Sequence, residues 1–320
     1  MIVVTGAIGF IGSCLVRFLN NKGYHNLILV DNFNRLHASS NLKNCQFHQK
    51  IDRKHFLEWL DNEKPKLKMI LHIGARTDTT ETDTDLFNRL NLHYSQAIAT
   101  FCSRFDIPLI YASSAATYGM GTLGFDDRLA PQDLTPLNPY GASKNDFDHW
   151  LLQQKRKPPF WAGLKFFNVY GPNEYHKGRM ASVIWHCYHQ IQSTGTMKLF
   201  RSHRSSVQDG AQSRDFIYIK DLLKIIDFMM QHQPKSGLYN LGTAKARSFK
   251  DLAEQTFRSL QKKPSIEYID TPIDIRASYQ YFTEATIQKL RQVGYQDSFY
   301  SLEAGIDDYV QQYLLKNAYY

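Results

Sequence analysis

Short apolar runs alternate with amphipathic stretches through the first half of the chain. The runs contain few polar residues, which is typical of strands buried on both faces of a sheet. Apolar positions three and four apart in the intervening stretches indicate helices. We expect strands within residues 1–6, 26–31, 67–75, 107–119 and 161–172, and helices within 12–23, 90–105 and 140–155. Strands separated by helices predict a doubly wound α/β fold with a parallel sheet.

The pattern is looser after Gly171. It predicts helices within residues 180–192 and 248–260, an extended segment at 197–200, and a strand followed by a helix within 215–232. No internal repeat, low-complexity tract or flexible linker interrupts the chain. We therefore expect a smaller lobe packed on the carboxyl edge of the sheet, where folds of this class bind ligands.

Composition narrows the class of protein. The chain has 320 residues, of which 43% are hydrophobic and 21% charged, as in globular enzymes. Its net charge of +8 could serve nucleic acid, but Lys and Arg are spread along the chain without a basic block, so anionic small molecules explain it as well. No apolar run approaches eighteen residues, and a strand is expected from Ile2, so we expect neither a membrane span nor an export signal. The four cysteines form no CxxC pair, as expected for reduced thiols in the cytoplasm.

Glycines follow the first expected strand in the stretch TGAIGFIG. Gly6, Gly9 and Gly12 would let a dinucleotide pyrophosphate approach the start of a helix, where free N–H groups point outward. Asp31 ends the second expected strand, nineteen residues after Gly12, at the position from which a carboxylate binds an adenosine ribose. A tight turn without a ligand is the simpler alternative for the glycines alone.

The choice between NAD and NADP stays open on these residues. Asp31 favours NAD because it would repel a 2′-phosphate. Asn32, Arg35 and Arg53 follow nearby in the chain and could neutralise that phosphate, or they could be solvated surface residues.

A tyrosine and a lysine stand four residues apart within an expected helix. Tyr140 and Lys144 would therefore lie on one helix face, where an ammonium lowers the pKa of a phenol that acts as acid or base. Ser114 ends the strand before this helix and could hydrogen-bond a substrate oxygen. Its neighbour Ser113 is better explained as a residue that caps a turn.

The assembled motifs resemble the extended short-chain dehydrogenase/reductase superfamily, through TGAIGFIG, the Ser114, Tyr140 and Lys144 set, and RDFIYIKD. Within it, YASSAATYG, NPYGASK, FFNVYGPNEYHKGRMASV and YNLGT are similar to the ADP-L-glycero-D-manno-heptose 6-epimerase family along nearly the whole chain. The resemblance implies a Rossmann domain at residues 1–168 and a substrate lobe mainly at 169–320, with some segments returning to the first domain. It also implies a bacterial cytoplasmic enzyme of lipopolysaccharide heptose synthesis, with ADP-heptose as substrate, bound NADP and a homo-oligomeric, pentameric assembly.

The resemblance gives Lys177 a role. Inversion at C6 of the heptose requires oxidation and reduction on opposite faces, so a second acid/base group is implied beside Tyr140. Contact with the substrate diphosphate is the alternative for this lysine. By the same resemblance, further cofactor contacts are Phe10, Ile11, Gly74, Ala75, Arg76, Thr77, Asn91 and Val169, and further substrate contacts are Asn168, Arg179, His186, Phe200, Arg214 and Tyr279.

Several positions depart from that family. Arg179 replaces a small hydroxylic residue, and the basic loop 201–215 replaces a shorter one. A lysine expected shortly after the second strand is missing, and Ala38 stands in that region. The missing lysine weakens the assignment of NADP, although Arg53 keeps NADP the preferred cofactor over NAD.

Other functions remain as alternatives. A UDP-hexose 4-epimerase would share the scaffold, whereas a 4,6-dehydratase would need an acidic residue where Ala115 and Ala116 stand. A cofactor-sensing or RNA-binding protein would not need the intact catalytic set. His186 and His189 could ligate a metal, but no third ligand accompanies them, and we assign no metal.

Overall fold

A seven-stranded sheet with the order β10-β6-β5-β4-β1-β2-β3 dominates the computed structural model, which describes residues 1–276 and 279–320. Every neighbouring pair in this sheet is parallel. The strand order reverses between β1 and β4, which confirms the expected doubly wound class. Its strands are β1 (Ile2–Thr5), β2 (Leu27–Asp31), β3 (Gln49–Asp52), β4 (Met69–His72), β5 (Leu109–Ser114), β6 (Trp161–Phe166) and β10 (Gly237–Leu241).

Helices cover both faces of the sheet because its strands alternate their side chains between two apolar cores. Val4, Leu29 and Leu71 point to one core, shared with α1 and α8, whereas Val3 and Ile28 point to the other, shared with α3, α5 and α6. The bounds of these helices are α1 (Phe10–Asn21), α3 (Phe56–Glu63), α5 (Tyr94–Arg104), α6 (Pro139–Gln153) and α8 (Ile219–His232).

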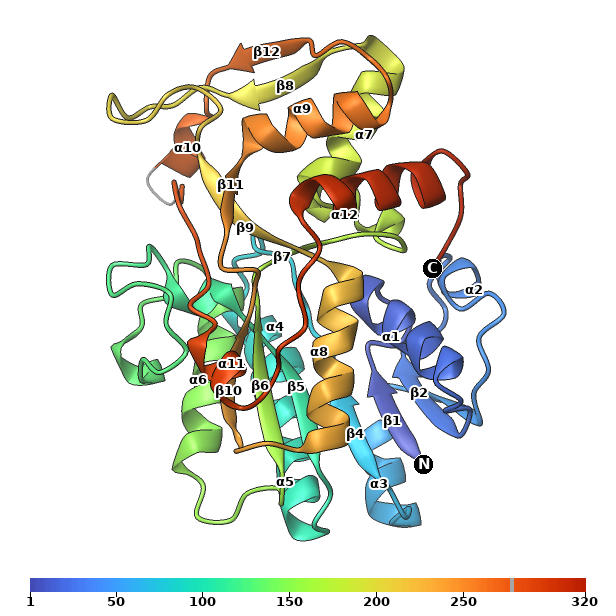
Figure 1. The fold of residues 1–320 in the computed structure, drawn as a ribbon. Coiled ribbons are helices and arrows are strands. Elements are labelled where there is room, and N and C mark those ends of the chain that lie inside the picture. The colour runs from blue at the N-terminus through green and yellow to red at the C-terminus, as the bar shows by residue number, and fades with distance from the viewer. Residues whose placement is uncertain (277–278) are drawn as a thin grey trace.

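Two small sheets lie beyond one end of the large sheet, together with α7, α9 and α12 (Figure 1). One small sheet has the order β11-β9-β7, and the other pairs β12 with β8. The bounds are β7 (Asn168–Tyr170), β8 (Met197–Phe200), β9 (Ser213–Tyr218), β11 (Ala246–Ser248), β12 (Ile266–Ile269), α7 (Val183–Thr194), α9 (Phe249–Ser259) and α12 (Leu302–Tyr309). The remaining short helices are α2 (Ala38–Asn41), α4 (Thr84–Phe87), α10 (Ile273–Arg276) and α11 (Gln288–Gln292).

Neither outer strand of the large sheet was predicted from the sequence. β3 is short and has two exposed residues among its four, so it lacks the apolar run that marks the inner strands. β10 is fully buried, but it follows β6 by about seventy residues in the chain and pairs with it only in space. The chain thus returns to the large sheet through α8 and β10 after the small sheets have begun.

None of the helices in the described ranges has the length and apolar character needed to cross a bilayer.

Candidate active site

A cavity of about 360 Å³ opens at the carboxyl ends of the central strands, between the large sheet and the β7-β9 sheet. It brings together residues from segments far apart in the sequence. Ten of the residues singled out from the sequence line it: Phe10, Ile11, Ala75, Thr77, Ser114, Tyr140, Lys144, Asn168, Val169 and Lys177.

The glycine turn leads directly into this cavity. Gly6 has a left-handed backbone (φ 67°), and a Cβ at Gly12 would lie 2.0 Å from the carbonyl oxygen of Gly6, so the turn admits no side chain there. Gly9 precedes α1 without any side-chain cap. Phe10 and Ile11, the first residues of the helix, line the cavity, so their N–H groups begin a helix that has room for an anion in front of it.

Asp31 lies beside the same turn. Its carboxylate accepts hydrogen bonds from the backbone N–H of Ile8, at 3.1 Å, and of Asn32, at 2.7 Å. Arg53 is held at this end of the site because its N–H donates to the Asp31 carbonyl oxygen. The side chain of Asn32 accepts from the N–H of Asn34 and shapes the local turn. The carboxylate therefore stands fixed where a ribose would follow a pyrophosphate bound at α1.

Tyr140 and Ser114 meet at the centre of the cavity. Asn138 caps α6 by accepting from Gly141, and Pro139 starts the helix, so Tyr140 lies in its first turn. Burial raises the pKa of the Tyr140 phenol, and a hydrogen bond with Ser114 opposes this effect. Ser114 Oγ also accepts from the N–H of Ala116. The turn-capping role that we expected for Ser113 thus belongs to Ser114.

Lys144 lies one helical turn after Tyr140. Its Nζ donates to the carbonyl oxygen of Ala112 at 2.8 Å, which fixes the side chain along β5. Burial lowers the pKa of Lys144 to about 8, and the nearby Asp148 carboxylate opposes that shift. Lys144, one helical turn from Tyr140, therefore keeps its positive charge at neutral pH.

Lys177 comes from a short helical turn, Tyr175–Met180, on the other wall of the cavity. Its Nζ lies 5.6 Å from the centre of the Phe10 ring. Burial lowers the pKa of Lys177, and the charge of Glu174 acts in the opposite direction. The preceding His176 stacks on His37, with ring centres 3.8 Å apart, which joins this turn to the segment after β2.

Three predicted cofactor residues stand behind the cavity wall. The Asn91 amide accepts from the N–H of Arg76 and donates to its carbonyl oxygen and to Ser143 Oγ, so it links the segment after β4 to α6. The Arg76 guanidinium pairs with Asp78 and Glu81. Gly74 packs against Gly6, where a Cβ would clash with the backbone. These residues shape the wall. The Asn91 amide and one terminal nitrogen of Arg76 have partners within the protein, whereas Arg76 Nε is buried without a hydrogen-bond partner.

Apart from Ser114 and Asn168, the predicted substrate residues fall into two groups outside the cavity lining. Arg214 is buried, and its guanidinium lies 5.5 Å from the ring of Phe249, which does line the cavity, and 5.6 Å from that of Tyr279. Phe200 packs edge-on against Tyr279, with centres 6.2 Å apart. Arg179 is exposed, and His186 lies near its carbonyl oxygen at the start of α7.

Residues 1–276 and 279–320 contain no cluster of three His, Cys, Asp or Glu side chains suited to a metal ion.

A family model and full-length relatives match this chain. The model described as "NAD dependent epimerase/dehydratase family" matches residues 2–242. The chain belongs to the NAD dependent epimerase/dehydratase family. It is 46% identical to an ADP-L-glycero-D-manno-heptose-6-epimerase of Fusobacterium nucleatum, over 100% of both chains, and 45% identical to one of Nitratidesulfovibrio vulgaris, over 98% of both. The crystal structure of the Helicobacter pylori ADP-L-glycero-D-manno-heptose-6-epimerase is similar, with a TM-score of 0.81 and 27% identity over 97% of this chain and 95% of that one.

Membership of the epimerase/dehydratase family makes the cofactor a nicotinamide dinucleotide. The residues present fit such a group. The start of α1 has no acidic residue in its first turn and no side-chain cap, which suits a pyrophosphate. Asp31 suits the adenosine ribose, and the Lys144 ammonium lies deeper in the cavity.

Two buried carboxylates beside this epimerase/dehydratase site, Asp148 and Glu174, were not predicted from the sequence. Asp148 is fully buried, pairs with Lys165 Nζ at 3.0 Å, and accepts from Ser113 and Tyr111 at 2.6 and 2.8 Å. Glu174 is also fully buried and lies at the start of the Lys177 turn. A signal was present in the sequence, because Asp148 follows Lys144 by four residues and Glu174 precedes Lys177 by three.

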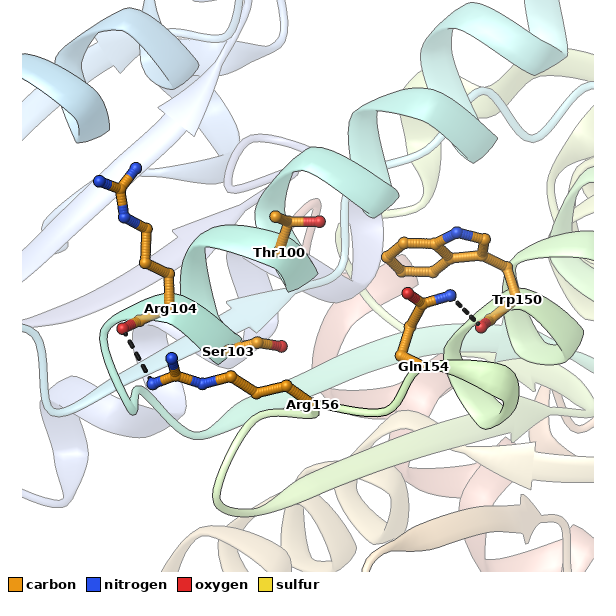
Figure 2. Close-up of a pocket in the computed structure, with 6 residues that line it drawn as sticks. All are labelled: Thr100, Ser103, Arg104, Trp150, Gln154 and Arg156. Carbon is orange, nitrogen blue, oxygen red and sulfur yellow. Dashed lines mark hydrogen bonds between the residues drawn. The ribbon is translucent and has the colours of Figure 1, made fainter.

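A second, smaller hollow lies at the opposite edge of the large sheet, between the ends of α5 and α6. Figure 2 shows Trp150 and Gln154 on one side and Arg104 and Arg156 on the other. Arg156 donates to the Arg104 carbonyl oxygen and pairs with Asp106, and the Gln154 amide donates to the Trp150 carbonyl oxygen. Its polar groups are engaged with one another, and it is remote from the epimerase/dehydratase site.

Proposed function

We propose that this protein interconverts the two C6 epimers of ADP-glycero-D-manno-heptose by transient oxidation and re-reduction at C6. One observation carries the proposal: a phenol on α6 and an amine on the 175–180 turn line the same cavity. The names and the full-length identity of the relatives support the choice of substrate. A simple dehydrogenase would need only one of these two groups.

Tyr140 and Lys177 divide the proton transfers in this mechanism. With the sugar in one orientation, the Tyr140 phenolate takes the proton of the C6 hydroxyl while the C6–H bond breaks and a carbonyl forms. After the carbonyl has turned within the cavity, the Lys177 ammonium donates a proton to its oxygen while the new C6–H bond forms on the other face. In the reverse reaction the two groups exchange roles. A bound nicotinamide dinucleotide would accept the hydride and return it.

The other residues orient the substrate and prepare the phenol. Ser114 holds the Tyr140 hydroxyl and would also contact the substrate oxygen. Lys144 supplies the positive charge that favours the phenolate. Asn168 lies on the cavity wall at the start of β7, where it would contact the sugar. Arg214 and the Phe200–Tyr279 pair would receive the diphosphate and adenine, since Arg214 contacts both Tyr279 and Phe249, a residue of the cavity lining.

We further propose NADP as the resident cofactor, with Arg53 and Asn32 beside Asp31 at the adenosine end. Arg179 and His186, at the rim, would contact the substrate only when it is bound. By resemblance, we expect a cytoplasmic homo-oligomer, a pentamer, built from a domain at residues 1–168 and a lobe mainly at 169–320. No nucleic-acid or membrane partner belongs to this proposal.

The test combines cofactor identification with stereochemistry. The protein is denatured, and the released dinucleotide is identified by mass spectrometry. Epimerisation of ADP-heptose at C6 is then followed by NMR for the wild type, Tyr140→Phe and Lys177→Met. Each variant should lose about 10²- to 10⁴-fold in rate while retaining the dinucleotide, as is typical for loss of a general acid or base.

Two outcomes would contradict the proposal in different ways. Full activity of Lys177→Met would overturn the assignment of two acid/base groups. A wild-type protein that ignores ADP-heptose but epimerises a UDP-hexose at C4 would overturn the substrate.

A further inference from the structure

We propose that Glu174 is a positioning residue that holds Lys177 in the cavity and keeps its amine protonated. The inference deepens the proposed function, because it concerns the state in which Lys177 can donate a proton. It is carried by the contacts of a fully buried carboxylate three residues before Lys177.

Glu174 closes the segment that carries Lys177 into a loop. Its carboxylate accepts hydrogen bonds from the backbone N–H of Ser182, at 2.6 Å, and from the Ser182 hydroxyl, at 2.7 Å. Its own carbonyl oxygen accepts from the N–H of Lys177, at 2.9 Å. Ser182 in turn caps α7 by accepting from Trp185. Both ends of the 174–182 segment are therefore fixed by one side chain, with Lys177 between them.

The surroundings of Lys177 would otherwise favour a neutral amine. Its Nζ lies near the Phe10 ring, and Ile11, Met180 and Val183 line the same cavity. An ammonium in apolar surroundings loses hydration, which lowers its pKa unless an opposite charge is close. For Lys177 the opposite charge is that of Glu174.

The other titratable groups that face Glu174 and Lys177 carry no charge at neutral pH. Burial raises the pKa values of Cys14, Tyr175 and Tyr309 above their ordinary ranges. Burial lowers the pKa of His176 to about 4, and the charges of His37 and Lys177 add to this effect. Burial also raises the pKa of the Glu174 carboxyl, and its hydrogen bonds with Ser182 and the charge of Lys177 act against that shift. The charge of each group thus opposes the effect of burial on the other, among neighbours that are neutral. Asp148 differs, because Lys165 already neutralises it.

The charge and the loop contacts can be separated with two variants. Glu174→Gln removes the charge but keeps an oxygen that can accept from Ser182. Ser182→Ala removes the hydroxyl contact but keeps the charge. In each protein the reactivity of Lys177 is measured against pH by competitive acetylation with acetic anhydride and mass spectrometry of the peptide that contains it. Thermal unfolding and retained dinucleotide are measured in parallel.

We expect Glu174→Gln to increase acetylation of Lys177 at pH 7 by roughly three- to tenfold, because the reactive amine fraction grows tenfold for each pKa unit lost. Ser182→Ala should leave this titration unchanged and lower only the unfolding temperature. Glu174→Asp, which keeps the charge on a shorter side chain, should lie between Gln and the wild type. It also provides the measurement if the Gln variant does not fold.

An unchanged Lys177 titration in a folded Glu174→Gln protein would overturn the inference, as would an equal change in Ser182→Ala. Acetylation reports the amine whether or not Lys177 takes part in catalysis. An active Lys177→Met would therefore refute the proposed mechanism while leaving the titration result valid.

Discussion

Burial acts in opposite directions on the acid/base residues of the site. It raises the pKa of Tyr140 and lowers those of Lys144 and Lys177, so each residue is driven toward its neutral form. Neutral forms would serve badly in the mechanism that we propose, because it needs a phenolate and an ammonium. The Ser114 contact with Tyr140 and the carboxylates near both lysines oppose the shifts.

The pH dependence of the reaction should reflect Lys144. A lysine is charged below its pKa, and burial places the pKa of Lys144 near 8, with Asp148 opposing the shift and His72 neutral beside it. Raising the pH through about 8 removes the charge, the phenol becomes harder to ionise, and kcat/KM should fall. The measurement is a pH–rate profile with ADP-heptose.

Lys144→Arg provides the control for the fall of kcat/KM at alkaline pH. A guanidinium stays protonated, so the variant should be slower overall but should keep its residual rate to higher pH. An alkaline limb at the same pH in both proteins would assign it to another group.

Residue-scale chemistry was only partly accessible from the sequence. Tyr140, Lys144 and Ser114 could be identified because their spacing relates to a helix and a strand end. Asp148 and Glu174 were missed, because their spacing from Lys144 and Lys177 does not show that the two carboxyl groups are buried. Their roles depend on burial beside Lys165 and Ser182, which folding brings close.

Elements around β5 are held together by one buried ion pair. Asp148 on α6 joins Lys165 on β6 to the hydroxyls of β5, and Lys165 also donates to Thr117. Both charged side chains are almost inaccessible to solvent. The pair therefore fixes α6, and with it Tyr140, against the carboxyl ends of the strands.

Replacing one partner of this ion pair should lower the free energy of unfolding far more than replacing both. We expect Asp148→Asn to destabilise the protein by about 3–5 kcal/mol, because Lys165 is left as a buried charge without a counter-ion. Urea unfolding followed by circular dichroism measures the loss. Asp148→Asn combined with Lys165→Met should recover a large part of it. A double variant as unstable as the single one would show that packing, and not charge, limits stability here.

The inner elements could be predicted because β1, β2, β4, β5 and β6 are apolar runs, whereas the outer strands could not. β3 has two exposed residues among its four, and β10 owes its place to a partner far away in the chain. The two small sheets likewise join strands separated by long insertions. Pairing over such distances leaves no local pattern.

At the scale of the whole molecule, the cavity lies between two parts of the chain, and a dinucleotide would contact the glycine turn, the segment after β4 and α6 together. Binding should therefore stabilise the entire fold. With cofactor-free protein, NADP at about 100 times its Kd should raise the free energy of unfolding by about 2.7 kcal/mol.

NAD at the same concentration should raise the free energy of unfolding by less if Arg53 and Asn32 receive a 2′-phosphate. Thermal unfolding with each dinucleotide makes the comparison. Equal or greater stabilisation by NAD would reverse the cofactor preference that we propose.

The late arrival of β10 has a consequence for synthesis on the ribosome. Until residue 241 is made, β6 is the last strand on its side of the large sheet, and the backbone groups on its outer edge have no partner strand. Roughly 75 residues separate the ends of the two strands, which at about 5–20 residues per second means roughly 4–15 s of translation. During that interval nascent chains can pair edge to edge with one another. Rapid translation of residues 167–241 should thus favour correctly folded over aggregated protein.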